Sequence, residues 1–417
     1  MNRLFLLIVF SMVLLAIEYY SYQGLKVAVG STSDAFQRVS KFLFFALSTI
    51  TFTGFILFEP LSKNAATRSF LTFFMTIGIA NILGKILFAI WLLIDDLIRL
   101  ARLIWAKLNP QVEVVQKDGI SRIEFLTQAG AVSAALPLLG MGWGVVSGAH
   151  DYRVLKRTIE LSNLPEAFDG LTITQISDIH SGSFWNRNAV ERGIALVNEQ
   201  KSDLIFFTGD LVNNVTSELD GWTDLFGSLR ADLGVYSVLG NHDYGDYVQW
   251  ESDSAKRKNL TDLIETQKRM GWDLLMDENR TISKGDDQIS IVGIQNWGAK
   301  GRFPKYGDLE KAMKGTAKSS IKLLLSHDPS HWKEQVLPEF KDVDIMFSGH
   351  THGFQFGIEV GQLKWSPVKY FYPEWADLYT KGAQHLYVNR GFGYLGYPGR
   401  LGILPEITVI TLRRSEG

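Results

Sequence analysis

Polar residues with metal-binding side chains follow five short apolar runs in the carboxyl-terminal part of the sequence. The runs 171–176, 204–207, 235–239, 321–325 and 344–347 lead into SDIH, TGD, GNHD, SHDP and GHTHG. Together these motifs supply Asp178, His180, Asp210, Asn241, His242, His327, His350 and His352, which include five of the eight histidines. Oxygen and nitrogen donors of this kind suit Mn²⁺, Fe²⁺ or Zn²⁺. The pattern therefore predicts a divalent metal site.

The number of donors favours two ions over one, because eight donors are too many for a single ion and fit a pair that shares a carboxylate. Two metals about 3.5 to 4 Å apart can clamp both the attacking and the leaving oxygen of a phosphoryl transfer. A bound metal also lowers the pKa of water, so that hydroxide forms without a protein base. The chain has no cysteine, which excludes thiolate ligands and cysteine nucleophiles.

The elements that must position these residues are short buried strands. The apolar runs are partly β-branched, which is typical of buried strands, and Val190, Ile194 and Val197 between the first two have helical spacing. This βαβ-like alternation places the polar residues at the carboxyl ends of strands, where open α/β sheets bind ligands. The later runs 288–294, 385–388 and 406–411 predict strands without intervening helices, and hence a second, more antiparallel sheet.

The five motifs, in this order and at these spacings, resemble those of the calcineurin-like metallophosphoesterases over residues 155–417. The tail NRGFGYLGYPGRLGILPEITVITL is similar to the ending of the membrane-associated branch of that family. The resemblance implies an α/β fold, a four-layer α/β/β/α sandwich, in a catalytic domain at 149–417. It also implies hydrolysis of phosphodiester or phosphomonoester bonds by a hydroxide that bridges two divalent metal ions.

Site residues carry over from the resemblance one by one. It implies that Asp178, His180 and His352 bind the first metal, that Asn241, His327 and His350 bind the second, and that Asp210 bridges both.

His242 would then assist the leaving group, and Asp243 would orient its ring. His331 has no place in this set and is expected at the surface. Two residues depart from the family pattern: Phe354 replaces the second glycine of GHTHGGQ, and Ser181 replaces a leucine after SDIH. Both departures concern the shape of the substrate pocket and not the ligands.

Residues 1–148 read as a transmembrane region of about four helices. The apolar segments are 4–20, 42–58, 70–94 and 129–146, and about 20 residues span a bilayer. A cleaved signal peptide is the alternative for the first segment. Lys85 interrupts the third, where a lysine either snorkels to the interface or faces a neighbouring helix.

Membrane orientation follows from the basic residues. Loops 21–41 and 95–128 carry eight lysines and arginines against six on the opposite side, which favours the loops in the cytoplasm. The stretch ISRIEFLTQAGAVSAALPLLG also resembles a twin-arginine export signal in which Ile123 stands at the second arginine. Both observations predict an integral membrane protein with an extracytoplasmic catalytic domain.

The predicted partner is a phosphate ester, with a membrane or envelope lipid phosphate as candidate. Aromatic residues in 369–379 and 391–399 are either core or an apolar lip that accepts the lipid. A lipid-linked pyrophosphatase resembling the UDP-diacylglucosamine hydrolases is one alternative, and a non-catalytic metal- or phosphate-binding membrane sensor is another. The net charge of -2 gives no reason to expect nucleic acid.

Overall fold

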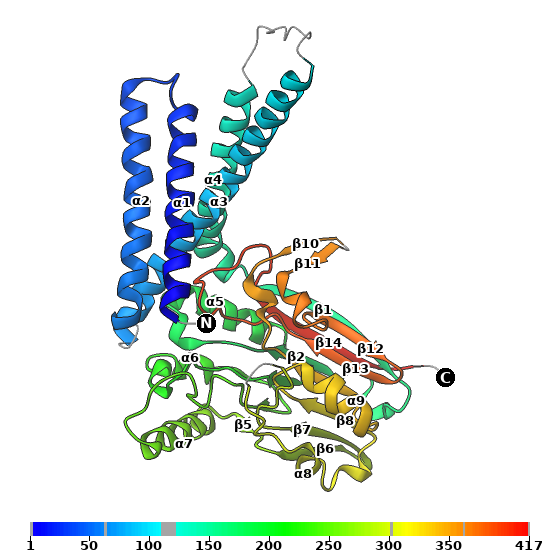
Figure 1. Ribbon diagram of the computed structural model, residues 1–417. Coiled ribbons are helices and arrows are strands. Elements are labelled where there is room, and N and C mark those ends of the chain that lie inside the picture. The colour runs from blue at the N-terminus through cyan, green and yellow to red at the C-terminus, as the bar shows by residue number, and fades with distance from the viewer. Residues whose placement is uncertain (1–2, 62–64, 110–121, 301–302, 362, 416–417) are drawn as a thin grey trace. The chain divides into compact units, whose positions relative to one another are not determined.

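The computed structural model describes residues 3–61, 65–109, 122–300, 303–361 and 363–415. Its contacts divide the chain into two compact units, Met1–Trp143 and Gly144–Gly417. Each unit is described by itself (Figure 1). The division falls inside the fourth helix, close to the end of the apolar region of the sequence.

The first unit consists of long helices in the part that the structure describes. They are α1 (Arg3–Ala28), α2 (Asp34–Leu61), α3 (Ala65–Leu108) and α4 (Arg122–Val146), the last of which continues into the second unit. Among the described residues, three stretches are long and apolar enough to cross a membrane: Asp34–Phe58, Leu71–Leu108 and Phe125–His150. The predicted span 4–20 lies within α1, which does not meet this measure, so a count of four spans is not shown.

Helix α3 corrects the prediction of a loop over 95–128. It is 44 residues long and continues as helix to Leu108. The carboxylate of Asp95 pairs with Nε of Arg99 one turn later at 2.6 Å, an arrangement that stabilises an exposed helix. The part of the predicted loop at 110–121 lies outside the described residues.

The second unit contains two six-stranded mixed sheets (Figure 1). The first sheet has the order β1 (Arg153–Leu161), β14 (Glu406–Arg414), β2 (Thr172–Ile176), β3 (Leu204–Phe207), β4 (Val235–Ser237) and β5 (Asp273–Leu274). The second has the order β12 (Asp377–Lys381), β13 (Gln384–Val388), β9 (Ile345–Ser348), β8 (Ile321–Leu325), β7 (Asp287–Gly293) and β6 (Glu278–Lys284). Strands β2, β3 and β4 run parallel, as do β7, β8 and β9.

The alternation of side chains along each strand builds the layers. In β3, Ile205 and Phe207 pack with α5 (Arg187–Glu199), α6 (Thr223–Phe226) and α7 (Asp253–Arg269). Leu204 and Phe206 point the other way and pack between the sheets, against residues of β7, β8 and β9.

The second sheet is covered in the same way on its outer face. Val292, Leu324 and Met346 pack against α8 (Leu309–Ala312) and α9 (Leu337–Glu339). The order helix, sheet, sheet, helix confirms the predicted α/β/β/α class.

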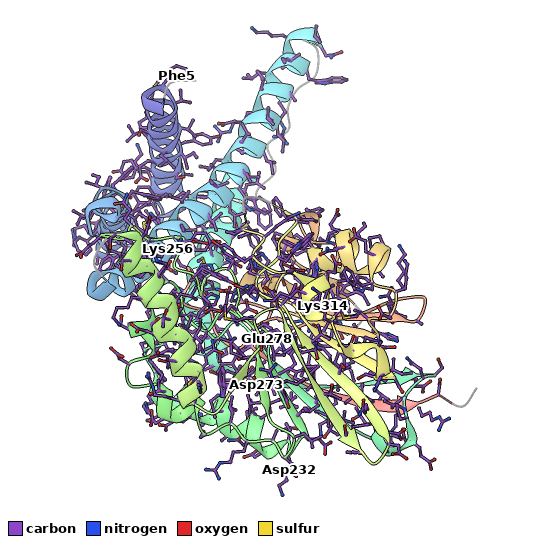
Figure 2. All side chains as sticks on the ribbon, turned by 90° about the horizontal axis from the view of Figure 1, so that it is seen from below. Phe5, Asp232, Lys256, Asp273, Glu278 and Lys314 are labelled. Carbon is purple, nitrogen blue, oxygen red and sulfur yellow. The ribbon has the colours of Figure 1, made fainter. Side chains whose placement is uncertain are left out.

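Two further features complete the second unit. A two-stranded hairpin is formed by β10 (Ile358–Val360) and β11 (Leu363–Trp365). The edge strands β5 and β6 are joined by Arg280, whose guanidinium contacts Asp273 at 2.8 Å and Glu278 at 3.0 Å. Both carboxylates are labelled in Figure 2.

Candidate metal centre

The strand ends of both sheets deliver the residues predicted as ligands. In the first sheet, Asp178 and His180 follow β2, Asp210 follows β3, and Asn241 and His242 follow β4. In the second sheet, His327 follows β8, and His350 and His352 follow β9. Because parallel strands end at one edge of a sheet, these loops gather side chains that are far apart in the sequence.

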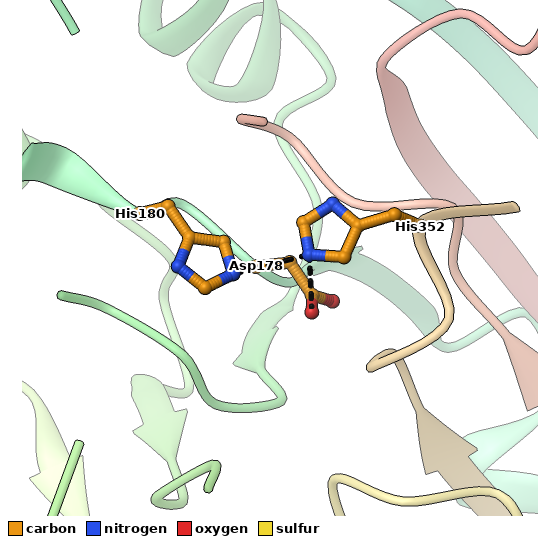
Figure 3. Close-up of side chains that lie close together, drawn as sticks. All are labelled: Asp178, His180 and His352. Carbon is orange, nitrogen blue, oxygen red and sulfur yellow. Dashed lines mark hydrogen bonds and ion pairs between the residues drawn. The ribbon is translucent and has the colours of Figure 1, made fainter. Parts of the chain in front are cut away.

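The first group consists of Asp178, His180 and His352, whose ligand atoms all lie within 4.8 Å of one another. Figure 3 shows the two rings and the carboxylate directed at one point. Nε2 of His352 lies 3.2 Å from Oδ1 of Asp178 and 3.0 Å from Nε2 of His180. All three side chains are buried. One carboxylate oxygen and two imidazole nitrogens therefore converge at a buried position.

The second group consists of Asp210, His327 and His350, again within 4.8 Å. Nε2 of His327 lies 3.1 Å from Oδ2 of Asp210 and 3.3 Å from Nδ1 of His350. The same oxygen of Asp210 lies 3.5 Å from Nε2 of His180 in the first group. Asp210 thus faces both groups, as a shared carboxylate must.

Strained backbone holds these side chains in place. Asp178, His180, Asp210, His350 and His352 all have positive φ, between 50° and 70°. Such conformations cost free energy for residues with a Cβ and persist where the surrounding structure enforces them. The flanking glycines make room: a Cβ on Gly349 would collide with the carboxylate of Asp178, and one on Gly240 with that of Asp210.

Hydrogen bonds behind the rings fix which nitrogen faces the site. Nδ1 of His327 donates to the carbonyl of Thr208 at 2.7 Å, which leaves Nε2 toward Asp210. Nδ1 of His242 donates to the carbonyl of Asn213 at 2.7 Å. In His350 the order is reversed, because Nε2 contacts the hydroxyl of Tyr372 at 3.0 Å and Nδ1 faces His327.

The donor set fits a divalent cation. Besides the two groups, Oδ1 of Asn241 is buried and has no hydrogen-bond partner among the described residues. Its Nδ2 donates to the hydroxyl of Tyr247 at 2.9 Å, so the amide is oriented with the oxygen left over. Buried polar atoms normally have a partner. An ion bound by Asp210, His327 and His350 would supply one.

Burial and neighbouring charges set the protonation states. Burial would raise the pKa of Asp178, but the charge of His352 and its hydrogen bond hold it well below its usual range. Burial likewise opposes ionisation of Asp210, whose pKa His327 and His242 keep low. Burial lowers the pKa of His180 and of His350. Burial opposes the charge of His327, but Asp210 raises the pKa of that ring to about 10. Metal binds ionised carboxylates and neutral imidazoles, so His327 must release its proton when an ion binds.

The prediction that Asp243 orients the ring of His242 is wrong. The Asp243 carboxylate accepts backbone N–H groups from Asp210 at 2.9 Å, Leu211 at 2.8 Å and Gly240 at 2.9 Å. It holds together the two loops that follow β3 and β4. The ring of His242 has the carbonyl of Asn213 as its partner instead.

The expected surface position of His331 is also wrong. The residue is buried, with Nδ1 3.0 Å from Oγ of Ser326 and Nε2 2.9 Å from Oε1 of Gln335. Its ring lies against Trp297, with the ring centroids 4.6 Å apart. Burial lowers its pKa to about 4. His331 is therefore a neutral core residue outside both ligand groups.

Three residues next to the ligands were not predicted. Oδ2 of Asp328 lies 3.6 Å from Nε2 of His350 and 3.3 Å from the hydroxyl of Tyr372. Arg400 is buried, donates twice to the carbonyl of Gly393, and places Nη2 3.4 Å from Nδ1 of His352. The motif SHDP contained a signal for Asp328. No signal in the sequence marked Tyr372 or Arg400 beyond their positions in the aromatic and glycine-rich segments near the carboxyl terminus.

Family models match both parts of the chain. Residues 2–149 match a model described as "Probable Calcineurin-like phosphoesterase, transmembrane domain". Residues 171–354 match a model described as "Calcineurin-like phosphoesterase". The second match includes all the predicted ligands.

Known proteins are similar over the same region. An uncharacterized metallophosphoesterase of Bacillus subtilis is 30% identical over 305 residues, which are 71% of this chain and 99% of that protein. The zebrafish "Transmembrane protein with metallophosphoesterase domain" is 30% identical over 66% of this chain, and its bovine namesake is 29% identical over 65%. The chain spans 60% of the length of each vertebrate relative.

Proposed function

We propose, because this chain belongs to the calcineurin-like phosphoesterase family, that it hydrolyses phosphodiester or phosphomonoester bonds with two divalent metal ions. The family uses divalent metals, and the observation that carries the proposal is the pair of ligand groups with Asp210 between them. Phosphoester hydrolysis is a reaction that such a pair of sites serves. A bare metal-binding sensor would have no need of the histidine held beside the two groups.

The ligands are assigned to two ions. Asp178, His180 and His352 hold the first, and Asn241, His327 and His350 hold the second, with Asp210 shared. The mixture of oxygen and nitrogen donors without sulfur favours Mn²⁺, Fe²⁺ or Zn²⁺. When bound, such ions lower the pKa of water and neutralise charge on the phosphate.

His242 is assigned to the leaving group. Its backbone N–H donates to Oδ1 of Asp210 at 2.8 Å, and its ring centroid lies 5.0 Å from that of His180. Because Nδ1 donates to Asn213, Nε2 is the nitrogen free to hold a proton for the departing oxygen or to contact the phosphate. The carbonyl of Asn213 takes the orienting role that was predicted for Asp243.

The catalytic domain is assigned to 149–417 and the membrane region to 1–148. The chain is a membrane protein by its family match and its apolar helices. We place the catalytic domain outside the cytoplasm, on the count of basic residues in the membrane region. Alkaline phosphatase and green fluorescent protein, each fused after Gly417, test this orientation. An active phosphatase is expected, and fluorescence alone would reverse the orientation.

The proposed substrate is a lipid phosphate, which a membrane-anchored hydrolase meets at high local concentration. The experiment for the reaction itself uses bis(4-nitrophenyl) phosphate and the purified full chain with Mn²⁺. Asp210→Asn should lose both metals and turnover, whereas His242→Ala should keep two metals and lose roughly 10²- to 10⁴-fold in kcat. Wild-type protein that binds two metals without turnover would indicate a binding protein and not an enzyme.

A further inference from the structure

An exposed apolar surface begins at the candidate metal centre and continues onto the hairpin β10–β11. We name it the aromatic strip. Its members are Phe354, Phe356, Ile358, Trp365, Tyr370 and Phe371, of which all but the half-buried Trp365 are exposed. The Phe354 and Phe371 rings are nearly parallel with centroids 6.4 Å apart, and the Phe356 and Trp365 rings lie 6.5 Å apart. Ile358 lies opposite Trp365 in the hairpin.

Two members of the strip are close in the sequence to residues at the two ligand groups. Phe354 comes two residues after His352, which belongs to the first group. Phe371 directly precedes Tyr372, whose hydroxyl lies 3.0 Å from Nε2 of His350 in the second group. Phe354 is therefore two residues from a member of the first group, and Phe371 is next to a residue that contacts the second group.

Phe354 is held in a conformation that favours glycine. His352, Gly353, Phe354 and Gln355 have φ values of 51°, 54°, 58° and 55°, a left-handed turn. The buried Gln355 clamps this turn, because its amide donates to the carbonyl of Tyr397 at 2.8 Å and accepts from the N–H of Leu395 at 2.6 Å. Such strain costs free energy. Burial does not offset it, since Phe354 is 55% exposed.

The charged residues of the hairpin do not add net charge to the strip. Lys364 pairs with Asp377, and Glu359 accepts from Nη2 of Arg390 at 2.9 Å. The strip thus presents hydrocarbon and aromatic surface beside a site for phosphate. Exposed apolar surfaces of this kind mark binding sites.

We propose that the aromatic strip binds the hydrocarbon chain of a phosphate ester whose phosphate lies at the metal centre. The inference rests on the proposed function and names the surface that would bind the hydrocarbon part of the proposed lipid phosphate. Of the two alternatives left open for the aromatic residues of 369–379, Trp375 belongs to the core, because it is buried and its carbonyl accepts a hydrogen bond from Thr351. Phe371 of the same segment is exposed and forms the lip together with Phe354.

The experiment measures inhibition of bis(4-nitrophenyl) phosphate turnover by butyl, hexyl and octyl phosphate, with the full chain in nanodiscs. For wild type, the inhibition constant should fall about two-fold per added methylene. In free energy this is roughly half the effect of burying a methylene completely. In the Phe354→Gly/Phe371→Ala variant, the ratio of the inhibition constants of octyl and butyl phosphate should approach the value that partition into the bilayer alone produces. In Phe354→Leu/Phe371→Leu, which keeps apolar area, much of the wild-type ratio should return.

A matched control and a second readout separate binding from folding. Trp185→Ala removes an aromatic ring of similar exposure outside the strip and should keep the wild-type ratio. The alkyl phosphate concentration that half-maximally raises Tm gives the same ratio without turnover. Because glycine suits φ near 58°, Phe354→Gly should melt no lower than wild type.

Two outcomes would overturn the inference. One is a wild-type inhibition constant that does not depend on chain length. The other is an unchanged ratio in the Phe354→Gly/Phe371→Ala variant, including the case in which only its oligomeric state changes, which would make the strip an interface between copies. Failure of the proposed function looks different, since wild type would then turn over no phosphodiester at all.

Discussion

At the scale of single residues, the group behind each imidazole decides which ring nitrogen faces the metal centre. Carbonyl oxygens stand behind His327 and His242, and a carbonyl can only accept a hydrogen bond. Behind His350 stands the hydroxyl of Tyr372, which accepts from Nε2 and can donate to Asp328. This chain from ring to hydroxyl to carboxylate holds Nδ1 of His350 toward His327 of the second ligand group.

Removal of the Tyr372 hydroxyl should weaken the second metal site. In Tyr372→Phe the ring of His350 loses its partner, so the affinity for the second ion should fall about 10-fold while the first ion is retained. Metal content measured against increasing chelator concentration would show one of two ions leaving early. Tyr370→Phe removes a hydroxyl whose partner is Nε1 of Trp365, at 3.5 Å, and should leave both affinities unchanged. Equal weakening of both ions in Tyr372→Phe would argue against this relay.

The two groups of converging side chains could be predicted from the sequence, because each residue lies in a short motif after an apolar strand. Their orienting partners could not. Tyr372 is 22 residues from His350 along the chain, and its contact depends on the path of the hairpin between them. The partner of His242 is a main-chain carbonyl, which every residue has. The prediction for Asp243 was wrong because its position next to His242 in the sequence suggested a contact between the two side chains. The Asp243 carboxylate instead accepts hydrogen bonds from backbone N–H groups.

At the scale of elements, helices α1, α2 and α3 meet at a buried polar cluster. Nζ of Lys85 lies 2.7 Å from Oε2 of Glu18 and 2.6 Å from Oγ of Ser48. Lys85 therefore faces neighbouring helices and does not snorkel. The sequence left both alternatives for Lys85 open, because hydropathy does not show which helix contributes a counter-ion.

Breaking this ion pair from one side should destabilise the membrane unit. Lys85→Met leaves the carboxylate of Glu18 partly buried without its cation, which should lower Tm strongly, by a loss of about 3 kcal/mol or more. Glu18→Gln/Lys85→Met removes both charges and should recover most of the loss. Melting of the full chain in detergent, followed as a double-mutant cycle, measures the coupling. Independent effects of the two substitutions would show that the pair contributes little.

His331, which directly precedes the π-helix Trp332–Val336, should make stability depend on pH. The folded protein keeps the buried ring neutral with a pKa of about 4, whereas the unfolded chain binds a proton near pH 6.5. The folded pKa is the lower one, so stability is complete above pH 6.5 and falls as the pH drops toward 4. The loss at pH 5 should be about 2 kcal/mol.

The measurement is chemical unfolding of the full chain at pH 7 and pH 5. His331→Gln should be less stable than wild type at pH 7, because two hydrogen bonds change, but should lose about 2 kcal/mol less on acidification. Because the two proteins differ only at position 331, contributions from the rest of the chain cancel in the difference. Parallel pH curves for the two proteins would contradict the assignment of a buried neutral ring.

At the scale of the whole molecule, the candidate centre joins the two sheets of the second unit. Asp178, His180 and Asp210 come from loops of the first sheet, while His327 and His350 come from the second. Short β-branched apolar runs predicted the strands of both sheets, but their predicted grouping is wrong. Strands β8 and β9 belong to the second sheet, where they run parallel to β7, and β14 belongs to the first. The left-handed turn at His352–Gln355 could not be predicted, because its conformation depends on contacts with the distant tail.

Metal removal should therefore loosen the whole catalytic unit and not only its active-site loops. Each ion that binds the folded state alone stabilises it by about 2.7 kcal/mol at 100 times its Kd, so two ions contribute about 5.4 kcal/mol. A chelator that removes both should accordingly lower Tm by roughly 11 to 22 °C in a domain of this size. Asp210→Asn, which cannot share a carboxylate between two ions, should melt at the chelated wild-type temperature and respond little to chelator. A chelator that abolishes turnover while Tm stays constant would mean that the ions act on substrate without joining the sheets.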